Sequence, residues 1–219
     1  MLQAGAQWLN ALLLRYRLRL LFAASVLLTA VLGWPKPALW LAWGSLLLVL
    51  LASLNTLRHK RTLRGLIGLL GLASLALLVL ERVLQWHPLF GQGVGMMVFY
   101  LAMVASLFNR VIHERPVTGE LIYGLLALYL LLALAYAMAY QLISSLQPDA
   151  FRSLHGPLQI NDFVYYSLVT LTTLGYGDIH ALAPAARLLS VSEAVAGVMF
   201  IAIAVARSLM LINDRDDSA

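Results

Sequence analysis

The sequence predicts an all-α membrane protein, and three observations lead to this fold class. Of its 219 residues, 62% are hydrophobic and only 11% are charged, whereas soluble domains carry about 25% charged residues. The mean hydropathy of +0.85 is too high for a chain of this length to hide its apolar side chains from water. The charged residues also cluster between long apolar runs, as expected when helices cross a bilayer. This composition excludes a soluble enzyme.

Six apolar stretches are long enough to span a membrane. A helix needs about 20 residues to cross the hydrocarbon core, and flanking Lys or Arg side chains can extend a somewhat shorter helix to the interface. Glu193 interrupts the last stretch near one end. The six predicted transmembrane helices lie within residues 20–35, 37–57, 65–80, 83–109, 121–148 and 188–211.

A seventh apolar stretch lies between the fifth and sixth spans and is too short to cross. Its part before the first glycine, 163–172, would be about 15 Å long as a helix. Asn161 is a favourable N-cap residue and Asp162 suits a first helical turn. We therefore expect a re-entrant helix that enters the membrane, ends near Thr172 and returns as a loop.

Positive charges predict the orientation, because Lys and Arg accumulate in cytoplasmic loops. Of the 15 Lys and Arg residues, eleven fall on the side that holds both termini. The other four, which fall on the opposite side, are Lys36, Arg82, Arg152 and Arg187. We expect a multi-pass protein of the cell membrane, embedded in lipid, with both termini cytoplasmic and the re-entrant helix entering from outside. The basic clusters do not form one face, so no nucleic acid partner is expected.

The polar segment 109–120 predicts a boundary between two modules. It contains Pro116 and Gly119, and Thr118 can cap the helix that follows. Residues 1–115 would form a four-span N-terminal domain. The first 14 residues repeat apolar side chains at helical spacing and favour an interfacial helix. Residues 116–219 would form the second module, with two spanning helices around the re-entrant segment.

The glycine-containing loop carries the most specific chemical signal in the sequence. A protein that strips water from K⁺ has to replace it with oxygens, and consecutive backbone carbonyls turned to one side supply them. An ordinary strand alternates its carbonyls. A one-sided ladder needs left-handed dihedrals at intervals, which glycine adopts without steric cost. Gly175 and Gly177 around Tyr176 meet this need, and Thr173 adds a hydroxyl oxygen below the ladder.

The heptad Thr-Thr-Leu-Gly-Tyr-Gly-Asp at 172–178 resembles the Thr-Thr-Val-Gly-Tyr-Gly-Asp motif of K⁺ channels. Residues 117–210 are similar to the pore module of small bacterial K⁺-channel-like proteins. The resemblance implies a tetrameric pore whose selectivity filter consists of Thr173, Leu174, Gly175, Tyr176 and Gly177, with K⁺ bound at the first four of these residues. It also places Asp178 at the outer mouth of the pore, and His180, two residues further, would lie there as well.

Three positions depart from this motif or its context. Leu174 stands where Val is usual, which leaves open a weakly selective cation channel. Val169 stands where some relatives have Glu. Tyr165 replaces a Trp, and we hypothesise that its hydroxyl holds the Asp178 carboxylate. Together with Tyr166, Thr172 and Glu193, it forms the expected support of the filter.

The last span offers candidates for a hinge and a gate. Gly197 falls where many relatives have a hinge glycine, but it could equally serve close helix packing. Ile201, Val205 and Leu209 repeat every four residues and either line an inner vestibule that closes by dewetting or face neighbouring helices. Glu193 is expected to bond to the back of the re-entrant helix; an ion-coupled role is the alternative.

Taken together, these features predict a passive K⁺-selective channel that works as a homotetramer, because four chains must surround one axis. A non-conducting or transporter-type subunit is the remaining alternative. The fourth span carries no charge between residues 89 and 109, so weak voltage dependence is expected. No catalytic or metal-ligand pattern is present in the sequence, so we expect neither enzyme activity nor a cofactor other than K⁺ as permeant ion.

Overall fold

The computed structural model describes residues 16–36, 38–56, 61–84, 91–113, 119–154 and 156–216. The expected interfacial helix 1–14 and the cap residue Thr118 lie outside these residues. The elements in chain order are α2 (Arg17–Leu32), α3 (Leu39–Thr56), α4 (Arg61–Leu84), α5 (Gly91–His113), α6 (Gly119–Leu146), the short 3-10 helix η1 (Pro148–Ala150), β1 (Phe151–Ser153), α7 (Ile160–Leu171), β2 (Ile179–Ala181) and α8 (Pro184–Asp216).

Each of the six predicted spans coincides with a helix, but the helices differ in how well they meet the length needed to cross a bilayer. Within the described residues, three segments are both long and apolar enough: Val94–Ile112, Gly119–Leu146 and Pro184–Met210. The apolar parts of α3 and α4 are shorter, Trp40–Thr56 and Gly65–Ala76, and α2 has 16 residues. The long apolar helices indicate a membrane protein with three candidate spans.

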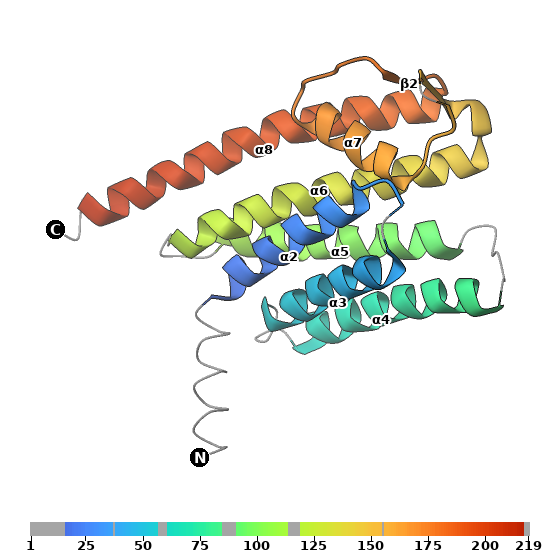
Figure 1. Ribbon diagram of the computed structural model, residues 1–219. Coiled ribbons are helices and arrows are strands. Elements are labelled where there is room, and N and C mark those ends of the chain that lie inside the picture. Colours follow the sequence, from blue (N-terminus) through green and yellow to red (C-terminus); the bar gives the residue numbers. More distant parts are fainter. Residues whose placement is uncertain are drawn as a thin grey trace.

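Helix α6 is the centre of the fold. Figure 1 shows α2, α3, α4 and α5 on one side of α6 and α7 and α8 on the other, and α6 contacts α2, α5, α7 and α8. Its apolar side chains face both groups, and Leu131 and Leu134 are fully buried. A helix that is apolar around its whole circumference packs on every side, which explains its central position.

Helix α7 is the predicted short helix, with one correction at its start. It covers Ile160–Leu171, and Thr172 is its C-cap residue. The N-cap residue is Gln159, not Asn161, which lies in the first turn. The backbone N–H of Gln159 donates to the Asp162 carboxylate over 2.7 Å. An acidic residue in the third helical position reaches back to the cap in this way. Because Asp162 bonds to Gln159, the helix begins two residues earlier than predicted.

A two-stranded sheet joins the segments on either side of α7 and its loop, and the sequence did not predict it. Strands β1 and β2 are antiparallel, with Arg152 opposite His180 and Ser153 opposite Ile179. The Leu154 N–H also donates to the Asp178 carbonyl over 3.3 Å. Three-residue strands are too short to show a hydrophobic alternation. The sheet fixes the outer end of the glycine-containing loop.

Candidate functional site

The backbone after α7 alternates in handedness. Thr173, Gly175 and Gly177 have φ values of 61°, 58° and 78°, whereas Leu174 and Tyr176 between them do not have positive φ. The two glycines were predicted to adopt this conformation. Thr173 was not, because a β-branched residue avoids the left-handed region. Its positive φ continues the alternation by one residue towards α7.

Hydrogen bonds to the end of α7 set the direction of the loop carbonyls. The N–H groups of Leu174 and Gly175 both donate to the Val169 carbonyl, over 2.9 and 3.3 Å, and the Thr173 N–H donates to the Thr170 carbonyl over 3.0 Å. In a planar trans peptide, the C=O points opposite to the N–H of the next residue. The carbonyls of Thr172, Thr173 and Leu174 are therefore directed away from α7, on one side of the chain.

This oxygen-bearing side of the loop lies on the surface of the single chain. Residues 172–177 are exposed, and the exposed fractions of the Leu174 and Tyr176 side chains are 60% and 68%. The Thr172 hydroxyl donates back to the Leu168 carbonyl over 2.6 Å, which secures the turn into the loop. One chain thus supplies an exposed loop in which the carbonyls of Thr172, Thr173 and Leu174 share one direction.

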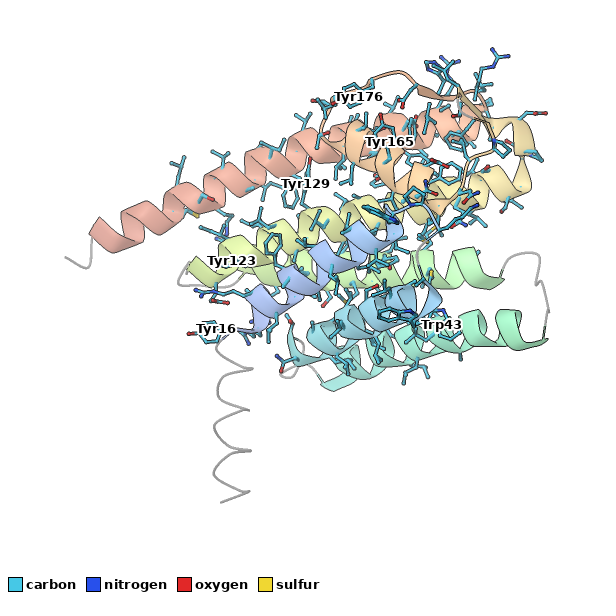
Figure 2. The ribbon with its side chains drawn as sticks, viewed as in Figure 1. Tyr16, Trp43, Tyr123, Tyr129, Tyr165 and Tyr176 are labelled. Carbon is cyan, nitrogen blue, oxygen red and sulfur yellow. The ribbon has the colours of Figure 1, made fainter. Side chains whose placement is uncertain are left out.

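Aromatic and acidic side chains hold the outer half of the loop. The rings of Tyr165 and Tyr176 are stacked, with centroids 6.5 Å apart. Figure 2 labels Tyr165 on α7 and Tyr176 in the loop that follows it. Loss of solvent, and then the nearby Asp178 carboxylate, raise the pKa of Tyr165 above its ordinary value; the bond between the Tyr165 hydroxyl and Asp178 stays a prediction. A Cβ atom on Gly177 would lie 3.6 Å from the His180 ring, so His180 is next to the loop.

We expect Tyr165→Phe to weaken the outer half of the loop. The substitution keeps the ring stack on Tyr176 but removes the donor to Asp178. A hydrogen bond to a charged group is worth about 1.5–3 kcal/mol when buried and less at this part-exposed site. If the chain conducts K⁺ as its sequence predicts, the rate at which the current declines should rise about fivefold. Because the raised pKa keeps the Tyr165 proton in place across neutral pH, the difference from the wild type should not vary there. Single-channel recording at several pH values measures the rate of decline and its pH dependence. An unchanged time course in Tyr165→Phe would show that the hydroxyl does not stabilise the loop.

Behind the loop, hydrogen bonds tie α7 to both neighbouring helices. Glu193 of α8 is fully buried, and it accepts a hydrogen bond from Tyr140 of α6 over 2.5 Å and contacts the Ser167 hydroxyl of α7. Tyr166 of α7 hydrogen-bonds to Ser190 of α8 over 2.8 Å. Glu193 thus lies against the back of α7, where the sequence placed it. Its hydroxyl partners Tyr140 and Ser167 were not predicted.

Gly197 lies at the closest approach of α8 to α7. A Cβ atom on this residue would lie 2.2 Å from the Leu171 carbonyl oxygen, which also accepts a hydrogen bond from Tyr129 over 3.1 Å. Helix α8 continues without a break through this position. Of the two sequence interpretations, this structure displays close packing, with no bend at Gly197.

The candidate gate residues lie on an open face of α8. Ile201, Val205 and Leu209 are each at least half exposed. These side chains are therefore largely uncovered within the single chain. They are free to line a vestibule or to meet another copy.

We expect at most weak voltage dependence. Arg110 is the one Lys or Arg residue in the sequence of α5, and its guanidinium Nη1 donates to the Thr56 carbonyl at the end of α3 over 2.6 Å. A voltage sensor moves several charges through the field, each worth about 2.3 kcal/mol per 100 mV. Conductance measured against voltage in planar bilayers should therefore change gradually. A steep sigmoidal curve would contradict this expectation.

A short helix that ends in a loop with one-sided carbonyls, placed between two long apolar helices, is an arrangement typical of the pore region of a membrane channel. In agreement, residues 125–213 match the ion channel family, which is less than half of the chain. Over 86 residues, the chain is 38% identical to two pore potassium channel c of Oryza sativa subsp. japonica, an alignment that covers 38% of this chain and 19% of that protein. The chain therefore spans about a fifth of its relative's length. No solved structure is significantly similar to it. Residues 125–213 are therefore similar to the ion channel family.

Proposed function

We propose that this protein is a passive K⁺-selective channel and that residues 173–177 form its selectivity filter. The observation that carries the proposal is the alternating backbone at Thr173, Gly175 and Gly177, combined with the two N–H groups that the Val169 carbonyl holds. Together they direct successive carbonyl oxygens to one side, as replacement of a K⁺ hydration shell requires. The match to the ion channel family and the potassium channel relative support the same function.

The functional unit in this proposal is a homotetramer with fourfold symmetry. One chain supplies one row of oxygens, and an ion has to be surrounded, so four rows around an axis are needed. The exposed loop and the exposed apolar face of α8 support this assembly, since both would otherwise remain without protein neighbours. Asp178 and His180 would then form rings at the outer mouth.

In the full proposal, the chain crosses the cell membrane six times, with both termini in the cytoplasm, and residues 1–115 form a scaffold around the pore module 116–219. Contacts between the two parts support this role. Arg19 of α2 forms an ion pair with Glu120 of α6, at 2.5 Å. Arg207 of α8 donates to the Val111 carbonyl of α5 over 2.8 Å. The scaffold thus contacts both long helices of the pore module.

A weakly selective cation channel is the second candidate function, and one observation favours it. The Leu174 side chain is 60% exposed rather than packed behind the filter backbone of its own chain. In a tetramer, a side chain larger than Val would have to fit between neighbouring chains. Poor packing there would widen the filter and reduce the preference for K⁺ over Na⁺.

We expect Val205→Asp to raise the open probability. In the proposed vestibule, Val205 is one of the apolar side chains whose constriction excludes water when the pore is closed. Four added carboxylates would hydrate the constriction, so the open probability should rise about tenfold, which corresponds to about 1.4 kcal/mol. Single-channel recording measures the change, with Leu188→Asp, at the opposite end of α8, as a control. No change in Val205→Asp would place the gate elsewhere.

The test of the proposed function is K⁺ flux into liposomes that contain the purified chain. We expect flux driven by the K⁺ gradient alone, block by Ba²⁺ from the side of the filter, and a four-subunit product after chemical crosslinking. Empty liposomes and liposomes with heat-inactivated protein are the controls. Flux carried equally by Na⁺ would favour the weakly selective channel, and absence of flux at a demonstrated tetramer would favour a non-conducting subunit.

A further inference from the structure

A buried cluster of oxygens joins three helices behind the proposed filter. Glu193 of α8 has no exposed surface, and Ser167 of α7 is likewise fully buried. Tyr140 Oη of α6 lies 2.5 Å from Glu193 Oε2, and Ser167 Oγ is in hydrogen-bond contact with Glu193 Oε1. Ser167 Oγ also lies 2.7 Å from the Ala133 carbonyl of α6. The cluster contains three short oxygen–oxygen contacts in one chain.

Hydrogen atoms can be counted in this cluster. Each of the three contacts needs one hydrogen between its two oxygens, because two oxygens at such distances repel when both present lone pairs. A carbonyl and an ionised carboxylate only accept, whereas Ser and Tyr hydroxyls donate one hydrogen each. Tyr140 and Ser167 therefore supply two hydrogens for three contacts. With Glu193 ionised, one of the two contacts of Ser167 lacks a hydrogen.

A proton on Glu193 Oε1 completes the count. The carboxyl then donates to Ser167 Oγ, Ser167 donates to the Ala133 carbonyl, and Tyr140 donates to Oε2. The Ala133 carbonyl has a second lone pair and can accept this bond in addition to its helix bond. We infer that Glu193 is a proton-binding site in the folded chain and that its bound proton completes a hydrogen-bond chain from α8 through α7 to α6.

The surroundings of Glu193 support a neutral carboxyl. Within the described residues, no Lys, Arg or His lies within ion-pair distance of it, and the titratable groups that face it are the phenols of Tyr129, Tyr140 and Tyr166, from α6 and α7. An unpaired carboxylate inside an apolar helix costs a few kcal/mol. The proton removes this cost without a partner cation.

The proposed proton site acts on the filter through α7. Ser167 lies two residues before Val169, whose carbonyl holds the N–H groups of Leu174 and Gly175. When the proton leaves, Ser167 turns its hydrogen to Glu193 and its bond to α6 is lost, so α7 is held less firmly. This consequence rests on the proposed function, and it makes Glu193 a positioning residue for the filter, which the proton regulates.

Infrared spectroscopy tests the proton directly and requires no conduction. The purified full-length chain in a detergent without ester carbonyls should show, at neutral pH, the C=O stretch of a protonated carboxylic acid. The band should be absent in Glu193→Gln and shifted in Ser167→Ala, which removes the acceptor of the proton. Asp149→Asn, in the exposed turn η1, is the matched control and should keep the band. A wild-type spectrum without this band, or a band that persists in Glu193→Gln, would overturn the inference.

Thermal unfolding tests the protonation of Glu193 through stability, and K⁺ flux tests its effect on the filter. Gln donates from its amide to Ser167 and accepts from Tyr140, as the protonated acid does, so Glu193→Gln should unfold at the wild-type temperature, whereas Glu193→Ala should unfold earlier. If Glu193 were ionised in the wild type, Ser167 would donate to it, and the amide N–H groups of Gln would face this donor. Glu193→Gln would then be less stable than the wild type, and this result would contradict the inference. In liposomes, alkaline pH should lower wild-type K⁺ flux severalfold and leave Glu193→Gln unchanged. A carboxylic acid band without any flux would overturn only the proposed function.

Discussion

Replacing Gly175 by Ala is expected to lower K⁺ flux by about a hundredfold or more. Gly175 has φ 58°, and a Cβ atom there would meet nothing within 4 Å in the single chain, so the effect is one of backbone strain rather than of a clash. A non-glycine residue in the left-handed region costs about 1–2 kcal/mol. In a tetramer the four copies of residue 175 would each carry this strain around the same narrow part of the pore. The strain favours rotation of the adjacent peptide, which turns its carbonyl oxygen away from the ion. Flux assays in liposomes measure the loss.

Gly156→Ala is the matched control for this experiment. Gly156 also has positive φ, 100°, and open space at its Cβ position, but it lies in the segment between β1 and α7, outside the proposed filter residues. Both substitutions therefore place a Cβ atom at a positive φ, and the strain at Gly156 is at least as large because φ 100° lies outside the left-handed region. Near-wild-type flux in Gly156→Ala with strong loss in Gly175→Ala would locate the effect in the filter. Equal flux in Gly175→Ala and the wild type would contradict a carbonyl filter at this position.

Gly197→Ala is expected to lower the temperature of unfolding by about 6–12 °C. The new Cβ atom would lie 2.2 Å from the Leu171 carbonyl oxygen, and a backbone oxygen at the end of a helix cannot move aside alone. Helices α7 and α8 would have to separate, at a cost of about 3 kcal/mol, the upper range for overpacking, and each kcal/mol lowers the midpoint by about 2–4 °C in a chain of this size. Thermal unfolding in detergent, followed by circular dichroism, measures the shift.

Gly44→Ala provides the comparison, because a Cβ atom on Gly44 in α3 would meet nothing within 4 Å. This variant should unfold at the wild-type temperature or slightly above it, since Ala favours a helix over Gly. If Gly197→Ala were as stable as Gly44→Ala but changed the open probability, Gly197 would act as a hinge and the close packing would not be its main role.

The helices and the positive φ of the two glycines could be predicted because they depend on local properties. Length and hydropathy place six helices, and the length of the stretch before Gly175 limits α7 to a helix that cannot cross. Glu193 was recognisable as a lone carboxyl in an apolar span, and Gly175 and Gly177 as residues that tolerate positive φ. These features depend on residue type alone.

The missed features depend on which residues meet in three dimensions. The positive φ of Thr173 occurs where the loop forms hydrogen bonds back to α7. Residue propensities for local conformation do not include such bonds. Gln159 became the N-cap because Asp162 reaches back to it. The contact of Ser167 with both Glu193 and Ala133 depends on the rotation of α7 against α6 and α8, and one apolar helix without strong amphipathicity does not reveal its rotation.

The reversal potential of the reconstituted wild-type chain tests the central claim most directly, namely that backbone oxygens of residues 173–177 replace water around K⁺. With K⁺ on one side of a planar bilayer and its concentration varied on the other, the account predicts a shift of about 59 mV for each tenfold change in K⁺ and little effect of added Na⁺. A reversal potential that follows Na⁺ and K⁺ equally would contradict a K⁺-selective filter, and a bilayer without channel events would contradict conduction itself.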